Sequence, residues 1–153
     1  MEELTLEELI KYTVRVQQDS FVFYRKAARI LEGNVMKTVT DELADFKVDQ
    51  LKRLKDLLSL YALASENRDY MVDVDTDLFD DILNNGDIPA QATPRDVLIL
   101  SLAREDKTAM TYDMILSLPD LEERAGKVYG LLFADEMERI GTLRKRITET
   151  IRR

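Results

Sequence analysis

The chain of 153 residues contains no cysteine and no histidine. Without cysteine it cannot form disulfides, thiolate zinc sites or iron–sulfur centres, and without histidine it lacks the commonest metal ligand and general base. The net charge of -8 argues against nucleic-acid binding, because affinity for the phosphate backbone depends largely on clustered Lys and Arg. No apolar run approaches the length of a membrane span, and the first residues do not resemble a signal peptide. We therefore expect a soluble, cytoplasmic protein.

Glycine and proline are scarce as well, with 5 and 3 residues, so long segments contain no helix-breaking residue. The composition, 45% hydrophobic and 34% charged, is typical of a globular chain of this length. These features predict an all-α fold with four long helices in one domain over residues 1–153.

Three helix starts are recognisable from capping residues. Thr5 with Glu8 three residues later forms a capping-box pattern, and Thr93 followed by Pro94 has a cap residue before a proline at the first helical position. Asp120 is a suitable cap for the last helix. We expect helices to begin at these three places.

Residues 5–54 recur at residues 93–143. Among the matching positions, each 88 residues apart, are Thr5 and Thr93, Gln17 and Glu105, and Tyr24 and Tyr112. We interpret the repeat as two copies of one helical hairpin, the first over about 5–64 and the second over about 93–151. The intervening residues, about 65–92, are more than antiparallel neighbours need, so they predict a long crossover.

Within the crossover, Leu78, Phe79, Ile82 and Leu83 have helical spacing and predict a short helix. The acidic run from Asp73 to Asp77 imitates the start of a calcium loop. It lacks the required Gly and Glu at the sixth and twelfth positions of that loop, however. We therefore expect a solvated acidic loop that caps the short helix.

Six polar residues lie at mid-length on the stripes that steps of three and four residues predict to be buried. They are Gln17, Lys47 and Gln50 in the first hairpin, and Glu105, Glu136 and Arg139 in the second. An unpaired buried ion costs on the order of several kcal/mol, so charges at these places need a partner or a metal. If a stripe is shifted by one position, some of the six face solvent and have no role.

The sequence around these positions resembles the rubrerythrin family. The segments that carry the resemblance are residues 17–28, 42–54, 104–112 and 133–143, and together with their order and spacing they extend it over nearly the whole chain. The resemblance implies a ferritin-like four-helix bundle that holds two irons. In that family one Glu comes from each of helices one and three, and a Glu-x-x-His from each of helices two and four.

Carried over position by position, the six ligands of the family fall on the six polar residues named above, and only Glu105 and Glu136 keep a ligand type. The resemblance therefore implies a degenerate metal site. We expect Lys47 and Arg139 to pair with Glu105 and Glu136 in place of metal ions. Gln17 and Gln50 would then satisfy the remaining hydrogen bonds.

Three functions are compatible with the sequence, and the first is favoured. In the first hypothesis, the chain is a non-catalytic ferritin-like protein without cofactor that has a structural, interaction or regulatory role. Alternatively, it is an oxidoreductase of ferroxidase or peroxidase type, with two Fe or Mn ions at an altered site that includes Glu105 and Glu136. In the third hypothesis Tyr24, Tyr112 and Tyr129 line a cavity for a small ligand, unless they simply pack in the core. The resemblance also implies a homodimer.

Overall fold

The computed structural model describes residues 2–63, 71–84 and 87–151, and this part of the chain is mostly helical. The elements along the chain are β1 (Glu2–Thr5), α1 (Leu6–Ile30), α2 (Lys37–Leu63), β2 (Met71–Val74), α3 (Asp77–Asn84), α4 (Pro94–Leu116) and α5 (Glu123–Ile151). The predicted all-α class is confirmed at this level. The beginning of the predicted crossover, residues 64–70, lies outside the described residues.

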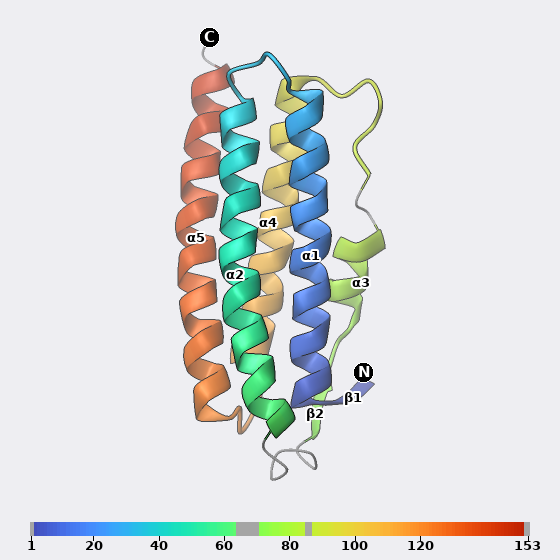
Figure 1. Ribbon diagram of the computed structural model, residues 1–153, viewed down its shortest axis with the longest axis vertical. Helices are drawn as coiled ribbons and strands as arrows, with labels where there is room; N and C mark the ends of the chain where they lie inside the picture. The colour runs from blue at the N-terminus through green and yellow to red at the C-terminus, as the bar shows by residue number, and fades with distance from the viewer. Residues whose placement is uncertain (1, 64–70, 85–86, 152–153) are drawn as a thin grey trace.

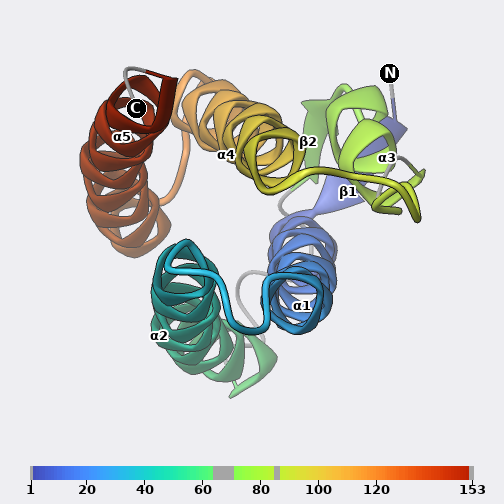
Figure 2. The ribbon, with the colours of Figure 1, turned by 90° about the horizontal axis from the view of Figure 1, so that it is seen from above.

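The four long helices run alongside one another, and each hairpin consists of two neighbours, α1 with α2 and α4 with α5 (Figure 1). Seen along the bundle, the helices surround a common axis in the order α1, α2, α5, α4 (Figure 2). The short helix α3 and both strands lie outside α1 and α4. The α1–α4 side is thus covered, whereas the α2–α5 side is not.

Both predicted capping boxes are present. The Thr5 hydroxyl accepts the backbone N–H of Glu8, whose carboxylate accepts the N–H of Thr5, each at 3.1 Å. Thr93 and Asp96 make the same reciprocal pair, and Pro94 occupies the first turn of α4. These bonds satisfy amides that a helix start leaves without a partner.

The predicted start of the last helix at Asp120 is wrong. Asp120 has a φ of 58°, in the left-handed region, whereas a capping residue has extended backbone. Instead α5 begins at Glu123, and the carboxylate of Glu122 accepts the N–H groups of Arg124 and Ala125, each at 3.1 Å. A glutamate therefore satisfies the first amides of α5.

The sequence did not predict the two strands. β1 and β2 form an antiparallel pair, in which Val72 and Val74 are buried and alternate with exposed neighbours. The expectation of a solvated acidic loop is only partly wrong at Asp73, which is exposed to solvent but lies between these valines in β2. It holds for Asp75, whose carboxylate accepts the N–H of Asp77 at the start of α3.

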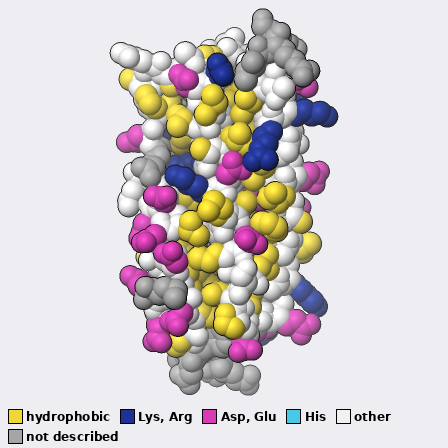
Figure 3. All heavy atoms as spheres, turned by 180° about the vertical axis from the view of Figure 1, so that it is seen from behind, with side chains coloured by type: hydrophobic (Ala, Val, Ile, Leu, Met, Phe, Trp, Pro, Cys, Tyr) yellow, Lys and Arg dark blue, Asp and Glu magenta, His cyan; other side chains and the backbone are white. Residues whose placement is uncertain are grey.

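Apolar side chains also lie on the surface. On the side of the molecule opposite the view of Figure 1, hydrophobic atoms form a broad band with acidic side chains at its edges (Figure 3). Over the whole described surface, the large exposed apolar residues include Leu60 of α2, Met110 of α4 and Leu131 of α5, at 48%, 55% and 59% exposure. Patches of this kind indicate contact surfaces when they are contiguous.

Candidate functional site

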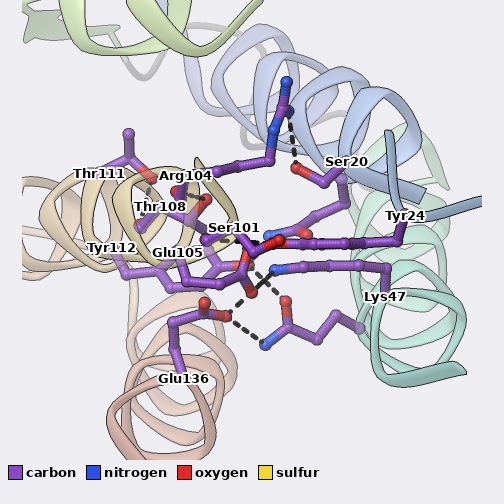
Figure 4. Close-up of polar contacts among 12 residues, drawn as sticks. Ser20, Tyr24, Lys47, Ser101, Arg104, Glu105, Thr108, Thr111, Tyr112 and Glu136 are labelled. Atoms are coloured by element: carbon purple, nitrogen blue, oxygen red, sulfur yellow. Dashed lines mark hydrogen bonds and ion pairs between the residues drawn. The ribbon is translucent and has the colours of Figure 1, made fainter. Parts of the chain in front are cut away.

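Five of the six predicted site residues lie together at the centre of the bundle, and all are fully or almost fully buried. They are Gln17 from α1, Lys47 and Gln50 from α2, Glu105 from α4 and Glu136 from α5. Figure 4 shows the polar groups of Lys47, Glu105 and Glu136 directed toward one another between the helices. The spacing of three and four residues turns these side chains inward, and the repeat places them at one level.

Lys47 is the central residue of the cluster. Its Nζ lies 2.5 Å from Oε1 of Glu105 and 3.4 Å from Oε2 of Glu136, and all three side chains are inaccessible to solvent. The other carboxylate oxygen of Glu105 accepts a hydrogen bond of 2.7 Å from the Tyr24 hydroxyl. One ammonium group from the first hairpin therefore contacts both carboxyl groups of the second.

Two ionised carboxylates beside one ammonium group would leave a net negative charge in the core. Burial raises the pKa of Glu136 well above its ordinary value, and the charge of Glu105 raises it further. Burial also acts to raise the pKa of Glu105. The charge of Lys47, with hydrogen bonds from Glu136, Lys47 and Tyr24, outweighs burial and holds that pKa below its ordinary value. Glu105 is therefore ionised and Glu136 protonated, and the cluster is neutral.

Both glutamines belong to the same network. Gln50 donates to Oε2 of Glu136 at 3.2 Å and accepts from the Tyr112 hydroxyl at 3.1 Å, while Gln17 donates to that hydroxyl. The bonds form a continuous connection from α1 to α5. Three buried oxygens, Oε1 of Gln17, Oε1 of Glu105 and Oε1 of Glu136, accept no hydrogen bond from the described residues, and that of Glu105 is in ionic contact with Lys47. Glu136 also hydrogen bonds to Glu105.

The three tyrosines expected to line a cavity are packed in the core instead. Tyr24, Tyr112 and Tyr129 are completely buried. Tyr24 and Tyr112 bond to the network, and the Tyr129 hydroxyl lies 2.9 Å from the Thr13 hydroxyl. Burial is the main cause that raises the pKa of all three, so they stay protonated. This arrangement favours core packing over a ligand cavity.

The expected pairing of Arg139 with the buried carboxylates is wrong. Arg139 is only half-buried, and its guanidinium lies 4.8 Å from the centre of the Phe46 ring. It lines a surface pocket of about 290 Å³ together with Asp49 and Glu138. A long cationic side chain at the edge of a buried stripe can extend along an aromatic ring into water, which avoids the cost of desolvation.

A different arginine is buried, and the sequence reasoning missed it. Arg104 donates to the carboxylate of Asp19 at 2.9 Å and to the hydroxyl of Ser20 at 3.1 Å, and it stacks on Phe23 at 4.5 Å. The repeat contained the signal, because Arg104 corresponds to Val16, which is 88 residues earlier and also buried. Arg104 therefore links α4 to α1 beside the central cluster.

These residues do not fit a di-iron centre. A metal between Glu105 and Glu136 would have to occupy the place of the Lys47 ammonium group, which would repel it. Within residues 2–63, 71–84 and 87–151, no group of three or more Asp, Glu, His or Cys side chains is arranged to hold a metal ion. The neutral amides of Gln17 and Gln50 do not replace the missing carboxylates and imidazoles.

Comparison with known proteins finds no matching family model, no similar curated protein and no similar solved structure. No described helix is both long enough and apolar enough to cross a membrane. Function is therefore inferred from the geometry of the buried network.

Replacing Lys47 with Met preserves much of its volume but removes the charge that faces two buried carboxyl groups. We expect the free energy of unfolding to fall by about 3–5 kcal/mol, the range for a buried ion pair that loses one partner. Urea denaturation measures this loss. Lys107→Met is the matched control, because Lys107 makes a partly exposed pair with Asp81 at 3.8 Å and its loss should cost less than about 1 kcal/mol. Equally small losses for both variants would contradict the buried network.

The protonation of Glu136 makes stability depend on pH. Because its folded pKa is raised, its contribution to stability is complete below the unfolded pKa, near 4.5, and is lost as the pH rises through the folded pKa. The native chain should therefore lose stability as the pH rises above about 5, and Glu136→Gln should remove this decline. Unfolding free energies measured at several pH values give the pH dependence of stability for both proteins. Parallel curves for the two proteins would show that Glu136 is not protonated in the folded state.

Proposed function

We propose that the chain is a ferritin-like protein of rubrerythrin type in which a fixed lysine has replaced the metal ions, and that its role is structural and interactive rather than catalytic. The observation that carries this proposal is the position of the Lys47 ammonium group between Glu105 and Glu136. Two hairpins joined by one long crossover support the ferritin-like topology.

The chemistry of the network supports a non-catalytic role. Ammonium, amide and carboxyl groups do not cycle between redox states, and this cluster is neutral without a metal. Lys47 also lies within the first hairpin and is satisfied by carboxyl groups of the second. Each hairpin therefore needs the other to provide most of the partners of its buried polar residues. The network fixes how the hairpins assemble, which is a structural function.

Iron binding tests this proposal directly. We expect anaerobic ferrous titration of the native chain, followed by oxygen, to give neither stoichiometric binding nor oxo-bridged absorption. A variant with Gln17→Glu, Lys47→Glu, Gln50→His and Arg139→His restores the ligand types of the family and should bind iron. The same variant with Lys47 retained is the matched control and should not bind, because the ammonium group still occupies the site. Two irons per native chain would overturn the proposal.

An apolar groove between α2 and α5 supports the interactive part of the role. It has a volume of about 640 Å³ and lies on the side of the bundle that the crossover does not cover. Leu57, Leu60, Val128 and Leu131 line it together with Arg53, Asp56, Arg124, Lys127 and Asp135. Because this lining carries both signs of charge, a second copy related by two-fold symmetry is a complementary occupant. We propose that the homodimer forms through this groove.

A charge introduced into the groove should separate the subunits. Leu131→Lys places a cation on the apolar surface, so we expect a dimeric native chain and a monomeric variant in sedimentation equilibrium. Met110→Lys is the control, since Met110 is similarly exposed but lies on α4. This control should remain dimeric. A native chain that is monomeric at all measured concentrations would exclude the homodimer.

A further inference from the structure

The groups around Lys47 have the arrangement that amide formation requires: a nucleophile, an acyl group, a proton carrier and a donor to the acyl oxygen. We propose that Lys47 and Glu105 condense to an intramolecular amide that joins α2 to α4, with Glu136 as proton carrier and Tyr24 as oxyanion donor. This inference rests on the proposed function, in which Lys47 takes the place of the metal. It assigns a covalent modification to the same site.

Proximity and burial favour the reaction. Nζ of Lys47 lies 2.5 Å from Oε1 of Glu105, in direct ionic contact. The carboxyl carbon that the nitrogen must reach is one bond further on. Reactants held in such contact react as if at very high concentration. Both side chains are inaccessible to solvent, so bulk water does not compete with the amine or solvate its charge.

The cluster already holds the number of protons that condensation needs. An ammonium group, a carboxylate and a carboxylic acid have the same atoms as an amine and two carboxylic acids. Transfer of one proton from Lys47 to Glu105 therefore prepares a neutral nucleophile and a neutral acyl group without exchange with solvent. The ion pair is the resting state, because Lys47 holds the pKa of Glu105 low, and the neutral pair is the less populated form from which the reaction starts.

The reaction then proceeds by addition and loss of water. The Lys47 nitrogen bonds to Cδ of Glu105, and the negative charge that develops on Oε2 is stabilised by the Tyr24 hydroxyl, which already donates to that oxygen at 2.7 Å. Glu136 accepts a proton from the nitrogen and donates its own to Oε1. The bond between Cδ and Oε1 breaks, one water leaves, and Glu136 ends protonated as it began.

The product would be a permanent link between the two hairpins. An amide between Lys47 and Glu105 closes a long loop, and such a link limits the freedom of the unfolded chain. It also removes the only full positive charge of the central cluster together with one carboxylate, so the core stays neutral. Gln50 keeps its bond to Glu136. The link would therefore strengthen the assembly that the ionic contacts begin.

Intact-mass spectrometry of the denatured native chain decides whether the bond forms. We expect a mass lower than the sequence mass by one water. Trypsin should fail to cleave after Lys47, and residues 38–52 should appear joined to residues 105–107. A folded native chain that keeps the full sequence mass after long incubation would overturn the amide. The iron titration is unaffected by this result, so the two proposals can fail separately.

Two variants test the roles of the neighbouring groups while both bonding residues remain. Glu136→Gln and Tyr24→Phe should slow the loss of water strongly, with circular dichroism reporting whether each still folds. The controls are Glu122→Gln and Tyr61→Phe, a second hydrogen-bonded glutamate and tyrosine outside the cluster, and they should lose water as the native chain does. Equal rates in all four variants would overturn the assigned roles. Glu105→Gln is unsuitable as a negative control, since its amide would lose ammonia and give the same bond.

Discussion

The need for electrical neutrality in the core is the constraint on which the rest of the structure depends. A lysine with no access to solvent must have an anion beside it, and Lys47 has Glu105 at 2.5 Å. The second carboxyl group is tolerated because burial keeps a proton on Glu136. Gln17, Gln50 and the buried tyrosine hydroxyls then satisfy most of the remaining donors and acceptors. The identity of each residue in the network follows from this balance.

The two hairpins are repeats in form but complementary in charge. The first supplies the ammonium group and two amides, and the second supplies both carboxyl groups. Neither hairpin could bury its own set alone without leaving a charge or a polar atom unpaired. Arg104 extends the same principle, since it joins α4 to Asp19 of α1 beside the cluster. Complementary buried polar groups of this kind favour one arrangement of the hairpins over apolar alternatives.

Particular residues show which parts of the structure could be predicted from the sequence. The alternation of three and four residues correctly placed Gln17, Lys47 and Glu105 in the core, because helical periodicity is a local property. It failed at Arg139, which occupies the predicted stripe but extends along Phe46 toward water. It also did not reveal β2, which pairs with β1 near the beginning of the chain and whose Val72 and Val74 are buried in the core.

Sequence alone predicts the four long helices, the starts of two of them and the burial of five of the six polar positions, because capping and helical period act over a few neighbouring residues. Tertiary structure alone decided which cation meets which carboxylate. Lys47 contacts the buried carboxyl groups, whereas Arg139 lies over Phe46. Arg104 is buried and pairs with Asp19. Those choices depend on distances between helices that are remote in sequence, and on the desolvation of each charge once the helices have packed.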